Sequence, residues 1–479
     1  MPQATPIYSA LKAYAGKDFL RLHMPGHAGK GIKQQELSAF ASLDVTEVPG
    51  LDDLHLPAGI IQQSQELLAR AFAAGDSCFL VNGATEGIHA LFLALGSEGK
   101  KILLPRNAHR SFYGGMVLSG AMPVYIPVQT EPGLGIALAV TAEDIDRLLR
   151  RNPEAEAVFF ASPSYYGTTC DIAAIAAVTR TWGKNLLVDE AHGAHFSFSK
   201  LYPQPALRSG ADAVVNGLHK TLPVLNQGAV LHLSASLADN SRIRKAASLL
   251  ATTSPSYPVL ASIELARQFM EENGESLLER AYEFSRHYRC QINHITGLKT
   301  CEQELREVTG VAQLDPLKVL VSVQGTALNG YQFASQLRDK HRIQVELEDS
   351  NVILAMFSIF HEAQDWKRFY QALEDIAYSY PGQGRKSVKV ELNPLPPMLL
   401  SPRQAFMAPC RRVALKDGVN QIAGEMIAAY PPGIPCILPG ELISREMIDY
   451  LAYLSRSGAR IQGPEDAALN YINIIDLPS

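Results

Sequence analysis

The sequence lacks the short motifs that mark several large enzyme classes. Its 479 residues contain no Gly-x4-Gly-Lys-Ser/Thr loop, no Gly-x-Gly-x-x-Gly turn, no His-Glu-x-x-His pair and no Gly-x-Ser-x-Gly elbow. Each of these motifs carries one kind of chemistry. Nucleotide hydrolysis, ordinary dinucleotide binding, zinc proteolysis and serine esterase chemistry are therefore disfavoured.

Paired cysteines and an excess of positive charge are missing too. The six cysteines, at positions 78, 170, 290, 301, 410 and 436, form no Cys-x-x-Cys pair, and 43 Lys and Arg residues stand against 48 Asp and Glu residues. Scattered thiols disfavour a zinc knuckle or a disulfide scaffold and fit a reducing compartment. A formal charge of −5 without a basic cluster disfavours nucleic-acid binding.

Long apolar segments are absent as well. Residues 1–17 contain no apolar stretch of the signal-peptide type, and the charge-free run 221–238 includes Pro, Asn, Gln, His and Ser. Such a run is too polar to cross a bilayer. We expect a cytoplasmic protein with no membrane partner and, from its ordinary 47% of hydrophobic residues, a large buried core.

What the sequence does contain is an alternation of short apolar runs with helix-like stretches. The runs are 78–81, 101–105, 122–128, 157–162, 185–191, 211–217 and 228–233. Several are continuously apolar, which is typical of parallel strands covered on both faces. Between two of them, Ile88, Leu91, Phe92 and Leu95 share one helical face. This alternation predicts an α/β domain with an open, mostly parallel sheet.

The pattern of apolar residues changes after this region. Amphipathic helices from about residue 275 flank two strand candidates, 317–323 and 351–358, which predicts a small α+β domain. The segment 390–402 carries four prolines and is typical of a linker. We therefore expect an N-terminal arm (1–30), a large domain (31–274), a small α+β domain (275–389), and a linker with a C-terminal α+β domain (390–479).

Three local features could carry chemistry. The segment 81–95 runs from a strand through an Asn-Gly turn into a helix, whose free N–H groups and dipole favour a phosphate. A buried strand ends in Asp189, and a second strand delivers His219 and Lys220 to the same edge of the predicted sheet. Each feature alone has an ordinary explanation: a common turn, a capping carboxylate with a core histidine at 192, or a solvated surface lysine.

Taken together, these features fit one cofactor. Pyridoxal phosphate needs an anion site for its phosphate, an acid beside its ring nitrogen and a lysine for a Schiff base. Each pKa unit by which Asp189 favours the protonated ring nitrogen corresponds to about 1.4 kcal/mol. We therefore predict a pyridoxal 5'-phosphate enzyme with the order phosphate turn, Asp189, Lys220, and we predict no metal site.

These motifs resemble the fold-type I, pyridoxal-phosphate-dependent ornithine/lysine/arginine decarboxylases, in the short form without an N-terminal receiver-like domain. The resemblance runs nearly end to end. It rests on RLHMPGH (21–27), DVTEVPGLDDLH (44–55), FLVNGATEGI (79–88), LLPRNAHRS (103–111), VDEAHGAHF (188–196), HKTLP (219–223), SPRQAF (401–406), YPPGIP (430–435), PGE (439–441) and QGPED (462–466). It implies an aspartate-aminotransferase-like large domain.

The resemblance also implies a reaction. The expected function is decarboxylation of arginine, lysine or ornithine to the corresponding polyamine-pathway amine and CO2, by a lyase that assembles as a homodimer or a larger homo-oligomer. Lys220 would form the Schiff base, Asp189 would hold the pyridine nitrogen and His192 would lie close to the imine. His109 would stack on the ring, and Glu441 would lie near the substrate end. The phosphate would be surrounded by Ala84, Thr85 and His219.

Three positions depart from the family pattern. Gly217 stands where the family often has a serine whose hydroxyl reaches the phosphate, and Ala84 stands where Thr or Ser is common. The loss of two neutral hydrogen bonds costs about 1 kcal/mol each, so we expect weaker cofactor retention unless Thr85 or Asn216 compensates. Ala28 replaces a lysine of the family's Pro-Gly-His-Lys run.

Two alternatives and one question stay open at this point. Another fold-type I reaction, such as an aminotransferase or an aldolase-type lyase, could use Arg403, Arg411 or Arg412 to clamp the substrate carboxylate. A non-catalytic regulatory homologue would not need Lys220 and Asp189. The acid that binds the cationic side chain of the substrate is also undecided. The candidates for it are Glu441, Asp52, Asp53 and Glu47.

Overall fold

The computed structural model describes residues 4–17, 24–25, 41–237, 240–382, 396–429, 434–457 and 460–476. The chain divides into two compact units. The first unit comprises residues 1–95, 185–200 and 204–278, and the second comprises residues 96–184, 201–203 and 279–479. The predicted position 28 and most of the motifs 21–27 and 430–435 lie outside the described residues.

The first unit is built on four strands in the order β1 (Asp76–Leu80), β10 (Ala229–Leu233), β9 (Ala213–Asn216) and β8 (Asn185–Asp189). β8 and β9 are parallel, whereas β10 is antiparallel to both β1 and β9. The predicted strand 228–233 therefore exists, but it is an exception to the parallel pattern. The cause is its connection: a chain that returns through a short loop reverses direction, whereas a parallel neighbour needs a long crossover.

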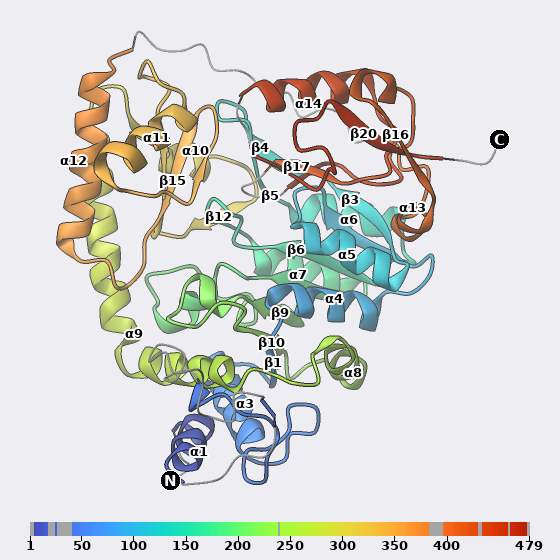
Figure 1. Cartoon of the computed structure of the whole chain (residues 1–479), viewed down its shortest axis with the longest axis vertical. Helices are drawn as coiled ribbons and strands as arrows, with labels where there is room; N and C mark the ends of the chain where they lie inside the picture. The colour runs from blue at the N-terminus through green and yellow to red at the C-terminus, as the bar shows by residue number, and fades with distance from the viewer. Residues whose placement is uncertain are drawn as a thin grey trace. The chain divides into compact units, whose positions relative to one another are not determined.

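Burial explains why these strands have continuous apolar sequences. Every residue of β9 and β10 is buried, so neither face alternates with solvent. α4 (Ala84–Leu95) packs against β9, because Gly87 has no side chain where a Cβ would come within 3.1 Å of Val215. α1 (Pro6–Ala15), α3 (Ile60–Ala71) and α8 (Ser241–Leu250) complete this unit, shown in blue and green at the lower part of Figure 1.

The second unit supplies three further parallel strands, in the order β6 (Ala157–Ala161), β2 (Lys101–Pro105) and β3 (Met122–Ile126). They alternate with α5 (Arg110–Ser119), α6 (Ala142–Arg151) and α7 (Ile172–Thr181). A short hairpin, β4 (Gln129–Glu131) and β5 (Ile136–Ala139), follows β3, and β7 (Thr168–Cys170) pairs with β12 (Val311–Leu314). The seven strands predicted between residues 78 and 233 are thus all confirmed.

A smaller antiparallel sheet follows in the second unit. Its order is β11 (Lys299–Thr300), β13 (Lys318–Ser322), β15 (Val352–Met356) and β14 (Leu347–Glu348), which confirms both predicted strands of this region. Its helices are α10 (Glu302–Arg306), α11 (Gly330–His341) and α12 (Ala363–Ser379). α9 (Tyr257–Ile292) runs unbroken through the boundary that the sequence predicts between residues 274 and 275 (Figure 1).

The C-terminal part has its own apolar core. α14 (Arg445–Ser457) contributes Met447, Ile448 and Leu451 to it, and these residues pack with Ile437 and Ile472 from the strands beside it. Those strands are β16 (Cys410–Ala414), β17 (Ile427–Ala429), β18 (Ile434–Ile437), β19 (Ile461–Gln462) and β20 (Tyr471–Ile475). α13 (Pro402–Met407) begins at the capping box of Ser401 and Gln404. Residues 383–395, which hold the first part of the predicted linker, lie outside the described residues.

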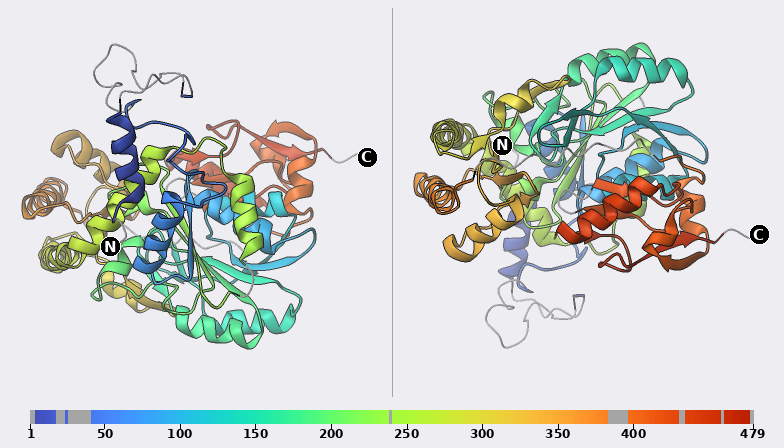
Figure 2. Two further views of the ribbon diagram at one scale, coloured as in Figure 1. Left: turned by 90° about the horizontal axis from the view of Figure 1, so that it is seen from below. Right: turned by 90° about the horizontal axis from the view of Figure 1, so that it is seen from above.

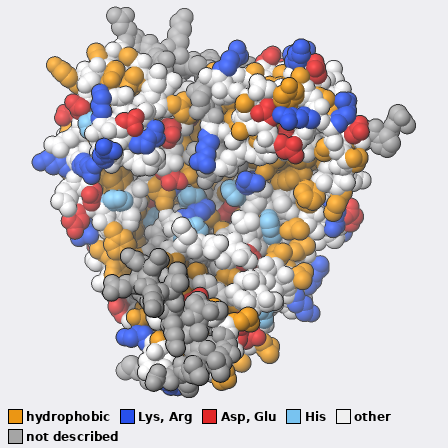
Figure 3. Space-filling view, in the orientation of Figure 1, with side chains coloured by type: hydrophobic (Ala, Val, Ile, Leu, Met, Phe, Trp, Pro, Cys, Tyr) orange, Lys and Arg blue, Asp and Glu red, His pale blue; other side chains and the backbone are white. Residues whose placement is uncertain are grey.

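Among the described residues no helix combines the length and the apolar character that a membrane span requires. On the face shown in Figure 3, the basic and acidic side chains of the described residues are interspersed. Figure 2 shows the same chain from below and from above.

Candidate active site

The carboxyl end of β8 presents a buried carboxylate. Asp189 is its last residue and only 6% exposed, and its Oδ1 accepts the N–H of Ala191 at 3.1 Å. Burial raises the pKa of Asp189, while the positive charge of Lys220 lowers that pKa. A buried carboxylate is costly without a cationic or donor partner. The position of Asp189 therefore favours a ligand that brings a protonated group.

The neighbouring parallel strand, β9, delivers the lysine. After Asn216 the chain makes a short 3-10 turn, Leu218–Lys220, in which the Lys220 N–H donates to the Gly217 carbonyl at 2.9 Å. The Lys220 Nζ lies 3.3 Å from Nε2 of His192. Parallel strands end at the same edge of a sheet, so Asp189, His192 and Lys220 come together as the sequence predicts.

The phosphate turn lies beside this lysine turn. Gly83 has the left-handed φ of +76° that favours glycine, and its N–H donates to the Gln227 carbonyl at 3.0 Å. The next carbonyl, that of Gly228, lies 3.0 Å from Nδ1 of His219. The loop at residues 227–228 thus contacts both the turn before α4 and the residue before Lys220.

The residues at the start of α4 differ in exposure. Ala84 is buried, whereas Thr85 is exposed and its hydroxyl can reach a ligand. Glu86 is buried, and its Oε2 accepts the Asn82 N–H at 2.9 Å. Burial raises the pKa of Glu86.

Asn216 is not arranged as a substitute phosphate donor. Its Nδ2 donates to the Glu190 carbonyl at 2.8 Å and to Glu190 Oε2 at 3.1 Å, while its Oδ1 is buried without a hydrogen-bond partner. The polar atom of the Asn216 side chain that is still without a partner is therefore a hydrogen-bond acceptor. The Thr221 hydroxyl is also buried without such a partner in the described structure. Its place directly after Lys220 was the signal that could have singled it out in the sequence.

Two predicted residues belong to the second unit. His109 caps the start of α5, and its Nδ1 lies 2.9 Å from the Ser111 hydroxyl. Glu441 is fully buried; its Oε2 lies 2.8 Å from Arg106 Nη2 and accepts the Leu438 N–H at 2.8 Å. Burial raises the pKa of Glu441, and Arg106 lowers it. The sequence did not predict this ion pair.

The other acids considered for the substrate side chain have different surroundings. Both oxygens of Asp52 accept backbone N–H groups, from Asp53 and Ala58 at Oδ1 and from Gly59 and Ile61 at Oδ2. Asp52 is thus committed to shaping its own loop. Asp53 accepts the His55 N–H at 2.8 Å. Glu47 accepts a hydrogen bond from the Thr46 hydroxyl, and its other oxygen is buried without a partner in the described structure.

The three arginines that could clamp a carboxylate all face acidic groups of the chain. Arg403 lies 3.2 Å from Glu98, Arg411 lies 3.4 Å from Asp476, and Arg412 lies 3.8 Å from Asp466 and over the ring of Tyr471. Their charges are therefore already compensated within the second unit. This arrangement weakens the aminotransferase alternative.

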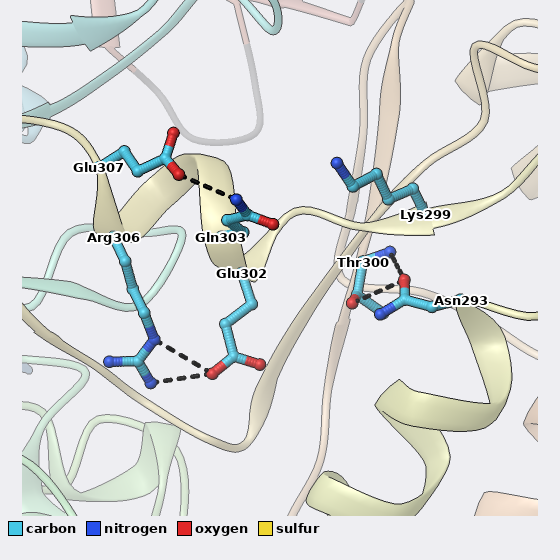
Figure 4. Close-up of a pocket in the computed structure, with 7 residues that line it drawn as sticks. All are labelled: Asn293, Lys299, Thr300, Glu302, Gln303, Arg306 and Glu307. Carbon is cyan, nitrogen blue, oxygen red and sulfur yellow. Dashed lines mark hydrogen bonds and ion pairs between the residues drawn. The ribbon is translucent and has the colours of Figure 1, made fainter.

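The pocket in Figure 4 contains none of the predicted site residues. It has a volume of about 430 Å³ and lies in the second unit, lined by Asn293, Lys299, Thr300, Glu302, Gln303, Arg306 and Glu307. Its polar side chains bond to one another: Arg306 to Glu302 at 2.8 Å and Gln303 to Glu307 at 2.9 Å. Because these polar groups already bond to one another, few of them remain available to bind a ligand.

The residues of the first unit fit pyridoxal phosphate. Asp189 is a buried carboxylate suited to a protonated ring nitrogen, Lys220 lies in the turn that follows the adjacent strand β9, and the turn before α4 lies next to the lysine turn. The Asn216 Oδ1 and the Thr221 hydroxyl are buried without a hydrogen-bond partner in the described structure, so both can still bond to a ligand near Lys220. His192 contacts the amine that the cofactor would engage.

The whole chain is similar to known amino-acid decarboxylases. The chain is 34% identical to an arginine decarboxylase of Bacillus subtilis over 98% of each chain, and 23% identical to the constitutive lysine decarboxylase of Escherichia coli over 96% of this chain and 78% of that one. The crystal structure of the Francisella novicida lysine decarboxylase LdcF superposes with a TM-score of 0.85, covers 98% of this chain and 81% of that one, and is 20% identical.

These similarities establish the fold as α/β with a seven-stranded, mostly parallel sheet. They also establish a pyridoxal-phosphate-dependent amino-acid decarboxylase. Residues 5–365 match the family described as "Orn/Lys/Arg decarboxylase, major domain", and residues 386–467 match "Orn/Lys/Arg decarboxylase, C-terminal domain". The chain therefore belongs to the Orn/Lys/Arg decarboxylase family.

Proposed function

We propose that the chain decarboxylates arginine in preference to lysine and ornithine, using pyridoxal phosphate bound through Lys220. The observation that carries the proposal is the arrangement of Asp189 and Lys220 at the ends of adjacent parallel strands, with His192 3.3 Å from the lysine amine. The preference for arginine is supported by 31–34% identity to arginine decarboxylases of Bacillus subtilis, Bacillus anthracis and Bacillus cereus, against 23% to lysine decarboxylases.

Each residue has a defined task in this proposal. Bound pyridoxal phosphate supplies an electron sink that accepts the electrons left when CO2 departs. Asp189 keeps the ring nitrogen protonated, because a buried carboxylate attracts a protonated group strongly where water is excluded. Lys220 and His192 are close enough to share a proton and to return one to the α-carbon. Thr85, His219 and the turn before α4 bind the phosphate, and His109 covers the ring.

We propose that burial of the substrate carboxylate adds to the rate that the cofactor supplies. A carboxylate held away from water and without a cationic clamp is destabilised relative to neutral CO2. Of the described arginines, Arg403, Arg411 and Arg412 each lie within 4 Å of an acidic side chain, which disfavours these three as that clamp.

We propose Glu441 as the acid that binds the guanidinium of the substrate. Its Oε2 is held by Arg106 and by the Leu438 N–H, while Oε1 is buried without a hydrogen-bond partner in the described structure. An N–H donor of a substrate would satisfy that oxygen. E441Q should therefore raise KM for arginine at least tenfold while changing kcat less. An unchanged KM would assign the guanidinium to another acid.

The test of the proposal measures CO2 and amine release with added pyridoxal phosphate, from arginine, lysine and ornithine in parallel. We expect agmatine from arginine at the highest kcat/KM, and less cadaverine or putrescine from lysine or ornithine. The K220A variant is the matched control for cofactor-independent release. Equal or faster release from lysine or ornithine would refute the arginine preference, and no release from any of them would refute the proposed function.

We also propose that the enzyme is a homodimer or a larger homo-oligomer, which the family resemblance supports. We propose a cytoplasmic location for it, because its scattered free cysteines fit a reducing compartment. Light scattering of the purified protein with pyridoxal phosphate should give at least twice the mass of one chain. A monomer at micromolar concentration that still decarboxylates would contradict this.

A further inference from the structure

We propose that Glu190 is a positioning residue of the decarboxylase: its buried side chain joins the carboxyl ends of β8 and β9 and sets how Asp189 and Lys220 face each other. Glu190 directly follows Asp189 and is 3% exposed. The proposal rests on the assignment of Lys220 and Asp189 to the cofactor. It concerns a different residue, which would act on these two through the strand ends.

The contacts of Glu190 reach both strand ends. Its backbone N–H donates to the Val215 carbonyl at 3.0 Å, and its carbonyl accepts from Asn216 Nδ2 at 2.8 Å. Its Oε2 accepts a second bond from Asn216 Nδ2 at 3.1 Å. Asn216 is the last residue of β9, and Lys220 follows four residues later. One side chain thus holds the base of the lysine turn against the residue after Asp189.

A third contact fixes the carboxyl from the opposite side. Glu190 Oε1 accepts the Ala206 N–H at 2.8 Å. Gly193 makes room for this conformation, because a Cβ there would lie 2.6 Å from Glu190 Cγ. The Gly193 N–H also donates to the Glu190 carbonyl at 2.9 Å. The turn that ends at Gly193 also carries His192. Glu190 therefore supports His192 as well as Asp189 and Lys220.

The charge state of Glu190 separates it from Asp189. Burial and, to a lesser degree, the neighbouring Asp189 raise the pKa of Glu190 to about 8, although hydrogen bonds from Ala206 and Asn216 oppose this. Near neutral pH Glu190 is therefore mainly uncharged and adds no second negative charge beside Asp189. A glutamine, which has the same shape and no charge, should replace Glu190 better than an alanine, which removes both side-chain contacts.

The chain offers a matched control at the other end of the same two strands. Asp212 Oδ2 accepts the Leu186 N–H at 2.7 Å, and the Asp212 N–H donates to the Leu186 carbonyl at 2.8 Å. Asp212 therefore joins the amino ends of β8 and β9, whereas Glu190 joins their carboxyl ends. D212A should weaken the strand pair without moving the groups at Lys220.

The experiment compares E190A, E190Q, D212A and wild type, each loaded with pyridoxal phosphate. The readouts are the pH titration of the visible absorbance band, which reports on Lys220 and its surroundings, and kcat and KM with thermal unfolding. E190A should shift the apparent pKa of the band by about one unit, and it should lower kcat about tenfold, equivalent to about 1.4 kcal/mol. KM should change less than threefold. E190Q should recover most of both effects.

The outcomes are distinguishable. D212A should unfold at a lower temperature while keeping the band and kcat of wild type. If E190A behaves as D212A does, Glu190 is only a core residue and the proposal is wrong. If E190A does not fold, E190D decides, because its shorter side chain cannot reach Ala206 and Asn216 together; a wild-type band in E190D would overturn the proposal. A wild type that binds the cofactor without decarboxylating would refute the proposed function, while the band would still test Glu190.

Discussion

The buried ion pair between Arg106 and Glu441 permits a quantitative stability prediction. The Arg106 side chain is 13% exposed and the Glu441 side chain is 0% exposed, with 2.8 Å between Nη2 and Oε2. R106M keeps an unbranched apolar stem and leaves the carboxyl with one described donor, the Leu438 N–H. Removing one partner of a buried pair costs about 3–5 kcal/mol. Because Arg106 is slightly exposed, we expect a loss of about 3 kcal/mol in the free energy of unfolding.

A second, smaller loss adds to this value. The Arg106 guanidinium lies 5.6 Å from the centre of the Tyr125 ring, and such a contact contributes about 0.5–1 kcal/mol. The total should be about 3–4 kcal/mol, a large part of the ordinary stability of about 5–15 kcal/mol. Urea unfolding followed by fluorescence and circular dichroism measures it through the midpoint and slope.

Two further variants identify the cause of the loss. R106M/E441Q removes both charges and keeps an acceptor for the Leu438 N–H, so it should lie within about 1 kcal/mol of wild type. R403M is the control, because Arg403 lies 3.2 Å from Glu98 but both side chains are well exposed. It should change stability by less than about 1 kcal/mol. A full loss in the double variant, or a loss below 1 kcal/mol in R106M, would refute the reasoning.

The pH dependence of the R106M stability loss gives an independent check, because its direction follows from the pKa of Glu441. Burial raises the folded pKa of Glu441 above its ordinary value, and the loss of Arg106 raises that pKa further. A carboxyl with a raised folded pKa contributes stability that is present below its unfolded pKa and is lost as pH rises through the folded pKa. The deficit of R106M should thus be smallest near pH 5 and larger at pH 8. A deficit that grows toward low pH would contradict the assignment.

Three other predictions concern the first unit. K220A should abolish turnover and the visible imine absorbance of the protein with pyridoxal phosphate, and normal decarboxylation by K220A would remove the lysine from its role. D189N should keep that absorbance and lower kcat at least about a hundredfold, or about 2.7 kcal/mol; near-normal kcat would refute the electron-sink role of Asp189. Because the folded pKa of Glu190 is about 8, wild type should lose stability relative to E190Q as pH rises toward 8 and no more above it. Urea midpoints of both proteins between pH 5 and pH 9 measure this difference, and a constant difference would show that Glu190 is charged throughout.

Much of the α/β architecture follows from local sequence. The run 101–105 is β2 without any change of bounds, and the runs around 187 and 214 are β8 and β9. A strand buried on both faces has no alternation, so its apolar residues stand together in the sequence. The edge of the sheet was predictable for the same reason, because Asp189 ends one such strand and Lys220 comes shortly after another.

Other features could not be predicted locally. The direction of β10 depends on how its connection returns, and its apolar sequence is the same for either direction. Asp52 had the sequence of a candidate binding acid, yet four backbone N–H groups occupy its two oxygens. Whether a carboxylate faces a ligand or its own loop is decided by the fold around it.

The sequence by itself determined the strands and the family, because each strand and each family motif is a short run of neighbouring residues; the roles of Asp189 and Lys220 stay predictions. Only the tertiary structure decided the partners of buried charges. Arg106 and Glu441 are separated by 335 positions, and Glu190 meets Asn216 across 26. The energy of such a contact depends on distance and on the exclusion of water. Both arise only when distant segments pack together.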